Sequence, residues 1–63
     1  MNKYRVDISE SIIHSVYVSA ENEEQARNTA YEFVMNGYSD EAIESYAEDS
    51  LGTGKIETYR VDE

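Results

Sequence analysis

Residues 3–20, KYRVDISESIIHSVYVSA, alternate apolar and polar side chains on both sides of a polar interruption at Glu10-Ser11. A period of two residues is typical of a strand that buries one face, so each half is expected to be a strand. Two such runs joined by a short connection predict an antiparallel hairpin, with its turn near residues 9–12. The alternation assigns the following side chains to the buried face: Tyr4, Val6, Ile8, Ile12, His14, Val16, Val18 and Ala20.

A helix is predicted over residues 22–36, directly after the hairpin. Asn22 can accept a hydrogen bond from the first helical turn, and Gln25 follows at the spacing of a capping box. Gly37 comes where a left-handed residue commonly ends a helix. Phe33 is expected at the centre of the core. The apolar residues of this segment recur at intervals of three and four, which favours one buried stripe: Ala26, Ala30, Phe33 and Val34.

The following segment has helical spacing as well, so a short second helix is predicted over about residues 40–49. Residues 52–54 are then expected to be a plain turn, and residues 55–61 a last strand. The tetrapeptide Tyr59-Arg60-Val61-Asp62 repeats Tyr4-Arg5-Val6-Asp7, which predicts that Tyr59 and Val61 face the core. The apolar residues whose spacing indicates this second helix are Ala42, Ile43, Tyr46, Ala47 and Leu51.

These elements predict one α+β domain over residues 1–63, with a ββαβ-like architecture. A right-handed crossover would place the last strand beside the first, which gives a three-stranded antiparallel sheet in the order 2-1-3. Both edges of such a sheet are open, and open edges favour pairing with another chain.

The composition excludes several classes of protein. The chain has 63 residues, no cysteine and a net charge of −9, so disulfides and thiolate metal sites are absent and direct binding to nucleic acid or anionic lipid is disfavoured. No apolar run approaches the roughly 18 residues of a membrane span. We therefore predict a soluble cytoplasmic protein without a membrane segment. The periodic apolar blocks and the aromatic content argue against disorder.

The negative charge is concentrated in one half of the chain. Residues 21–54 hold nine of the fourteen acids and one of the five basic residues, so this segment carries −8. On the predicted second helix, Asp40, Glu44 and Glu48 would stand four residues apart and repel one another.

Three interpretations of this acidic helical face stay open. It can serve solubility alone. It can imitate the charge of a phosphate backbone and occupy the basic groove of a nucleic-acid-processing protein, or it can bind another basic protein surface without such mimicry. Tyrosines beside the acids favour a binding surface. The predicted contact residues are Glu32, Tyr38, Asp40, Glu41, Glu44, Tyr46, Glu48 and Asp49.

Catalysis is not expected. His14 is the only histidine, and no arrangement of nucleophile, base and orienting group can be assembled around it. The acids near Asp40 lack the order of a calcium loop, so we predict no metal site and no cofactor. The alternative to a binding module with an acidic face is a small structural or regulatory adaptor that forms a homodimer through a sheet edge.

The run from Val16 to Ala26, VYVSAENEEQA, follows a strand at Tyr4 to Ser9 and resembles the start of the small DpnD/PcfM-like proteins of phages and mobile elements. In those proteins a hairpin ending in Val-x-Ala leads into an acidic-capped helix and then a further strand. The resemblance covers residues 3–37. It implies a phage or mobile-element context, action in the host cytoplasm, and an inhibitor of the anti-CRISPR or anti-restriction type, with no site residue transferred.

Overall fold

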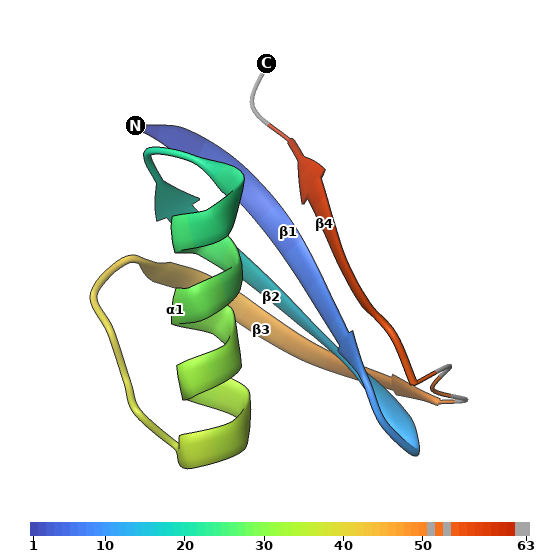
Figure 1. The fold of residues 1–63 in the computed structure, drawn as a ribbon. Coiled ribbons are helices and arrows are strands. Elements are labelled where there is room, and N and C mark those ends of the chain that lie inside the picture. The colour runs from blue at the N-terminus through green and yellow to red at the C-terminus, as the bar shows by residue number, and fades with distance from the viewer. Residues whose placement is uncertain (51, 53, 62–63) are drawn as a thin grey trace.

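The computed structural model of the chain describes residues 1–50, 52 and 54–61. Its elements are β1 (Asn2–Ser9), β2 (Ile12–Ala20), α1 (Glu23–Asn36), β3 (Ile43–Ser50) and β4 (Ile56–Arg60). The strands form one antiparallel sheet in the order β3-β2-β1-β4, and α1 packs on one of its faces (Figure 1). The α+β class is confirmed, but the sheet has four strands where three were predicted.

The predicted hairpin is confirmed. β1 and β2 pair antiparallel from Asn2 and Ala20 to Ser9 and Ile13, and the chain turns at Glu10-Ser11. Gly52 packs against this turn and donates its N–H to the carbonyl of Ser11. A Cβ atom at position 52 would overlap the Glu10 carbonyl, so only glycine fits here.

The predicted helix is also confirmed, together with both of its caps. The Asn22 side chain accepts from the N–H of Gln25 at 2.8 Å, and the Gln25 side chain accepts from the N–H of Glu21 at 2.7 Å. At the other end Gly37 has φ of 68°, and its N–H donates to the Phe33 carbonyl at 3.1 Å. Local hydrogen bonding therefore defines where α1 begins and ends.

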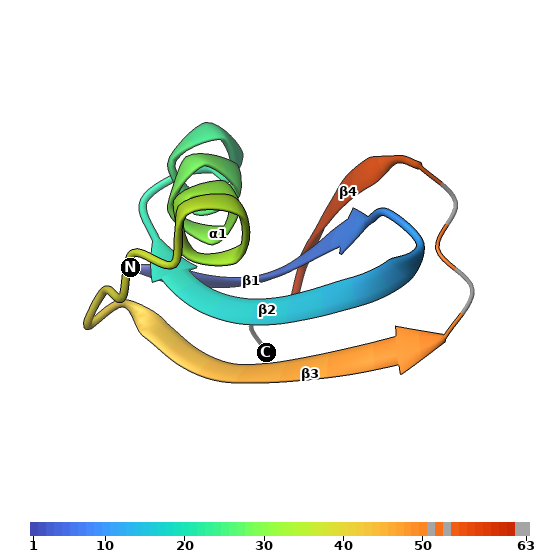
Figure 2. The same ribbon diagram turned by 90° about the horizontal axis from the view of Figure 1, so that it is seen from below.

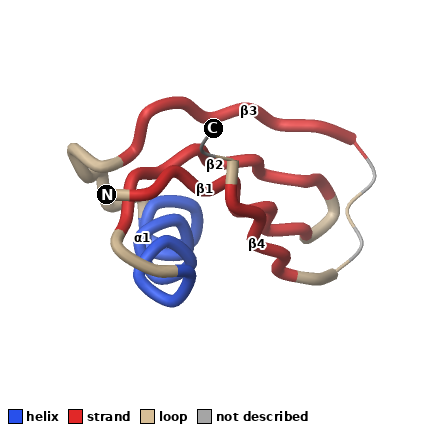
Figure 3. The backbone as a smooth tube through the Cα atoms, turned by 90° about the horizontal axis from the view of Figure 1, so that it is seen from above, coloured by secondary structure: helices blue, strands red, loops and turns tan. Residues whose placement is uncertain are grey.

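The core lies where α1 crosses the central strands (Figure 3). Val6 and Val16 are fully buried and Val18 is 1% exposed, and Ala26 and Ala30 of the helix are fully buried with them. The prediction that Phe33 occupies the centre is wrong, because Phe33 is only partly buried at the margin of this cluster. The small alanines allow α1 to approach the sheet, so the valines occupy the centre.

The second helix predicted at residues 40–49 is wrong. Residues 37–42 connect α1 to β3, and Ile43–Ser50 pair antiparallel with β2. Figure 2 shows β3 along the side of β2 that faces away from β1. A strand is favoured there because β2 is a central strand whose second row of backbone groups needs partners.

The last strand lies beside β1, as predicted, but its faces are reversed. Tyr59 and Val61 were expected in the core, and they are 40% and 39% exposed. Tyr59 pairs with Arg5, whose guanidinium carbon lies 4.4 Å from the centre of the tyrosine ring on the face away from α1. Ile56, which pairs with Ile8, lies on the face that carries α1 but is itself 44% exposed. An echoed tetrapeptide does not determine register, because register depends on the partner strand.

Four residues lie outside the described part of the chain: Leu51, Thr53, Asp62 and Glu63. They include Leu51 of the predicted second helix, Thr53 of the predicted turn, and Asp62 of the repeated tetrapeptide.

Backbone hydrogen bonds determine which residues of β3 point to its open side. In an antiparallel sheet the residues of a strand bond alternately to the neighbours on its two sides. Ser9 N donates to Lys55 O and Val61 N donates to Lys3 O, both at 2.9 Å. Odd-numbered residues of β1 therefore bond to β4, and even-numbered residues bond to β2.

The same alternation continues through β2 to β3. The β1–β2 pairing joins residues of equal parity, as does the β2–β3 pairing from Ile12 to Tyr17. Odd-numbered residues of β2 thus bond to β3, which agrees with the bond from Ser19 N to Ala42 O. It follows that Ser45, Ala47 and Asp49 of β3 bond to β2, whereas the N–H and C=O groups of Tyr46 and Glu48 point outward.

Amide hydrogen exchange is expected to alternate along β3. The N–H groups of Ser45, Ala47 and Asp49 bond to β2 and should exchange slowly, whereas those of Tyr46 and Glu48 should exchange at rates close to those of an unstructured chain. NMR-detected exchange measures this residue by residue. Uniform protection across residues 44–48 is the pattern of a helix and would contradict the strand.

Replacing Gly37 by Ala should destabilise the protein by roughly 1–2 kcal/mol, because a Cβ atom is strained at positive φ. No other atom lies within 4 Å of a Cβ built at this position, so the cost is one of backbone conformation alone. Urea denaturation measures the change. Gly37→Asn is the matched control and should lose less stability, since asparagine tolerates the left-handed region better. Equal losses for the two variants would contradict this account.

Candidate protein-binding surface

The eight residues predicted to contact a partner are all exposed, and they come from three consecutive parts of the chain. They do not form one helical face, because β3 is a strand and its side chains alternate between the two faces of the sheet. Glu32 lies on α1, Tyr38, Asp40 and Glu41 lie in the connection, and Glu44, Tyr46, Glu48 and Asp49 lie on β3.

Asp40 organises the start of β3. Its side chain accepts from the N–H of Ala42 at 2.8 Å, and its carbonyl accepts from the N–H of Ile43 at 3.1 Å. This is the turn-forming use of aspartate, in which a short side chain bonds to its own backbone two residues on. The repulsion expected between Asp40, Glu44 and Glu48 on a helix does not arise, since these residues are not on a helix.

Glu44 is held on the face of the sheet away from α1. Ser19 donates its hydroxyl to Oε2 of Glu44 at 2.5 Å, and Nζ of Lys3 lies 3.6 Å from Oε1. The hydrogen bond from Ser19 is the largest cause that lowers the pKa of Glu44, and Lys3 lowers it further. The Lys3 side chain is 60% exposed, so this ion pair contributes little to stability.

A bulge explains why Glu44 and Glu48 lie on opposite faces. The β2–β3 register shifts between Tyr17 and Val18, so that Tyr17 pairs with Ser45 while Val18 pairs with Ile43. Glu44 is the extra residue at this shift. Its side chain therefore lies on the face opposite to that of Tyr46 and Glu48.

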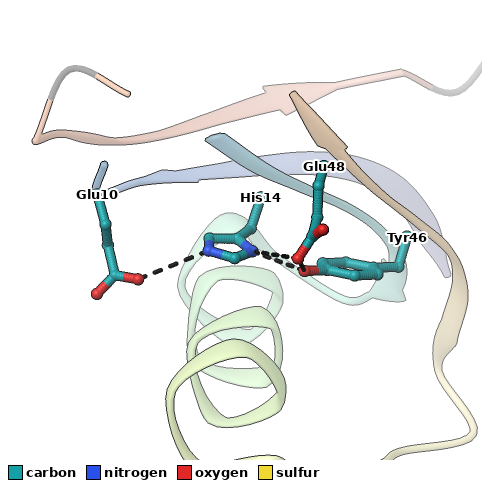
Figure 4. A network of polar contacts seen from close by, with 4 residues as sticks. All are labelled: Glu10, His14, Tyr46 and Glu48. Carbon is teal, nitrogen blue, oxygen red and sulfur yellow. Dashed lines mark hydrogen bonds and ion pairs between the residues drawn. The ribbon is translucent and has the colours of Figure 1, made fainter. Parts of the chain in front are cut away.

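Glu48 belongs to a polar network on the side of the sheet that α1 covers (Figure 4). Tyr46 donates its hydroxyl to Oε2 of Glu48 at 2.8 Å, and Nδ1 of His14 lies 2.6 Å from the same hydroxyl oxygen. Because the tyrosine proton is used on Glu48, Nδ1 of His14 is the donor in this contact. The other ring nitrogen, Nε2, lies 3.6 Å from Oε1 of Glu10. The network therefore links the hairpin turn to the edge strand.

Aromatic contacts extend the core toward this network. The Tyr46 ring meets Phe33 edge-on at 5.1 Å between ring centres and stacks on His14 at 6.0 Å. Burial raises the pKa of Tyr46, and the nearby Glu48 carboxylate raises it further. Both effects keep the phenol neutral and available as a donor.

A shallow hollow lies at the beginning of β3. Its rim includes three carboxylates, of which Asp40 and Glu44 have the partners described above, while Glu41 has no side-chain partner among the described residues. Such a rim attracts a cationic group. The hollow is lined by Met1, Ser19, Asp40, Glu41, Ala42 and Glu44.

Three residues that the sequence did not place in the site contribute to it: Lys3 and Ser19 hold Glu44, and His14 contacts Tyr46 and Glu48. The signal for His14 was its position on the apolar face of the hairpin, where a polar side chain needs a partner. Nothing in the local sequence indicates the pairing of Ser19 with Glu44, since it joins residues of different strands.

The hollow does not include the network of His14. Within residues 1–50, 52 and 54–61, no three histidine, cysteine or acidic side chains are grouped so as to hold a metal ion. In the same part of the chain, no helix is long and apolar enough to span a membrane. The absence of catalysis stays a prediction.

Comparisons of the chain with protein-family models, with curated proteins and with solved structures found no match.

Replacing Ser19 by Ala should raise the pKa of Glu44 toward the ordinary carboxyl value, because it removes the main stabilising contact of the carboxylate. An NMR titration of the Glu44 side chain measures this, and Lys3→Gln should cause a smaller rise. A carboxyl group whose pKa is lowered by folding stabilises the protein above its unfolded pKa and loses that effect as pH falls through the folded pKa. The stability difference between Ser19→Ala and the native chain should thus be larger at neutral pH than in acid. An unchanged titration of Glu44 would contradict the assignment.

Proposed function

We propose that the protein is a non-catalytic binding module that docks its acidic side on a basic surface of a nucleic-acid-processing protein. The observation that supports this is the distribution of charge over the fold. α1, the connection and β3 carry most of the acids and one basic residue, Arg27, whereas β1 and β4 carry both signs. The surface that meets the partner is an edge strand and a connection, in place of the acidic helical face that the sequence predicted.

The acidic side has a direct electrostatic consequence for which partners it attracts. A concentrated negative field repels nucleic acid and attracts the lysine-rich and arginine-rich surfaces that bind nucleic acid. Complementary charge speeds association and selects among partners. Glu41 in the connection has no side-chain partner among the described residues, so its charge is available to such a surface.

The biological setting is part of the proposal. The likeness of residues 3–37 to DpnD/PcfM-like proteins supports a phage or mobile-element origin. In that setting, a small acidic protein that occupies a nucleic-acid site acts as an inhibitor of host defence, of the anti-CRISPR or anti-restriction type, in the host cytoplasm.

The open sheet edges support a second candidate, an adaptor that forms a homodimer. β3 and β4 are both edge strands. β3 has three acids and no basic residue, so a second β3 would be repelled, and β4 is the edge at which two copies could pair. Under this reading the acids serve solubility alone.

Capture from a nuclease-treated bacterial lysate, followed by displacement with a short DNA duplex, tests the proposed function. The captured proteins should bind nucleic acid, and the duplex should release them because both ligands compete for the same basic surface. Release should also increase steeply with salt. Mass spectrometry identifies what is released. Captured proteins that resist both the duplex and salt would contradict the proposal.

Two single variants provide a matched comparison. Glu41→Gln and Glu57→Gln remove the same charge from exposed side chains without side-chain partners among the described residues, one beside β3 and the other on β4. Glu41→Gln should weaken capture, and Glu57→Gln should leave it nearly unchanged. Equal effects of the two variants on capture would show that only net charge matters and would contradict a binding surface at β3. A dimer that forms with increasing concentration in sedimentation would support the adaptor.

A further inference from the structure

We propose that the open edge of β3 binds an extended cationic segment of the partner, which joins the sheet as a fifth strand. This inference depends on the proposed function, because it names the form of the basic partner and the element that meets it. The partner is a protein segment with lysine or arginine opposite the acids of Ile43–Ser50, paired to this strand through its backbone.

The backbone of β3 is available for such pairing. Within the described part of the chain, β2 is the only strand that pairs with β3. The N–H and C=O groups of Tyr46 and Glu48 point to the open side, as the alternation of bonds requires. β3 has eight residues and no proline, and every residue from Glu44 to Ser50 is exposed. An edge of this length presents the unpaired row of groups to which an added strand binds.

Charge selects the occupant. The strand carries Glu44, Glu48 and Asp49 and no basic residue. Acids on a second copy would oppose these acids at short range, which disfavours self-pairing at this edge. A segment with lysine or arginine at the facing positions gains cross-strand attraction in addition to its backbone bonds. The other edge, β4, is shorter and carries both signs, so it offers no such selection.

The hollow at the beginning of β3 supports the same occupant. It adjoins the edge, and Asp40, Glu41 and Glu44 lie on its rim. A strand paired along β3 would end beside this hollow, where a long cationic side chain can place its charge among the three carboxylates.

A synthetic peptide of eight residues tests the inference. In antiparallel pairing its first residue would face Ser50, so lysines are placed second, third and seventh, opposite Asp49, Glu48 and Glu44. Threonine and valine, which favour strands, occupy the other positions. Calorimetry with the full-length protein should detect binding, and the amides of Tyr46 and Glu48 should become protected from exchange. No detectable binding, or binding without this protection, would overturn the inference.

Backbone methylation of the peptide separates strand addition from simple charge attraction. N-methyl groups on the third and fifth residues block the N–H groups that face Glu48 and Tyr46, and should weaken binding about tenfold or more, since two hydrogen bonds are lost. N-methyl groups on the fourth and sixth residues point to solvent and should change affinity little. The two peptides have the same charge, so equal affinities would overturn the inference.

Protein variants test the location. Glu44→Gln, Glu48→Gln and Asp49→Asn together should weaken peptide binding about tenfold. The matched control, Glu23→Gln with Glu24→Gln and Glu57→Gln, removes the same charge from α1 and β4 and should change affinity much less. Circular dichroism and chemical shifts check that both variants fold. Equal losses would place the peptide elsewhere and overturn the inference.

These results are distinguishable from those of the lysate experiment. If the two methylated peptides bind equally well while captured proteins are released by DNA, the proposed function stands and strand addition fails. If methylation has the expected effect while DNA releases nothing, β3 binds extended cationic segments but the partner does not process nucleic acid.

Discussion

The structure depends on the burial of three valines beneath two alanines. Val6, Val16 and Val18 of the central strands are covered by Ala26 and Ala30 of α1, and these five side chains are at most 1% exposed. Burial of a valine is worth roughly 1.5–3 kcal/mol, so this cluster provides much of the stability of a domain of this size. Because the side chains of Ala26 and Ala30 are small, α1 lies close to the central strands. A larger helical side chain, Phe33, extends to the edge and meets Tyr46 of β3.

Polar and aromatic side chains surround this core. At the margin of the core, the apolar side continues through Phe33, Tyr46 and His14. It ends in the hydrogen bond from Tyr46 to Glu48 and in the contact of His14 with the Glu10 carboxylate. These rings close the margin of the core and keep their polar atoms partnered. On the opposite face, Arg5 lies over the Tyr59 ring and beside Asp7, with side-chain exposures of 36% and 15% for the arginine and the aspartate. The same sheet therefore presents two chemically different faces.

The bulge in β3 determines how the acids are distributed. In a regular strand Glu44 and Glu48 would share a face, and the register shift at Tyr17 and Val18 separates them. Each carboxylate then has its own partners, Ser19 and Lys3 for one and Tyr46 and His14 for the other. The edge thus carries negative charge on both sides, which is why the proposed surface follows the strand and not one face of the sheet.

The sequence alone determined the elements whose signals are local. Alternation of apolar residues specified the hairpin and its buried face, and Asn22 and Gly37 specified the ends of α1, because capping involves only neighbouring residues. The sequence also showed where the acids and the neighbouring tyrosines are concentrated along the chain, because residue type is known without the fold. Only the tertiary structure decided that residues 43–50 form a strand. Their apolar spacing of Ile43, Tyr46 and Ala47 suits a helix, and the free edge of β2 outweighs that preference. The register of β4, the bulge at Glu44 and the contact of Ser19 with that residue were likewise decided by pairing between distant segments, which no local pattern specifies.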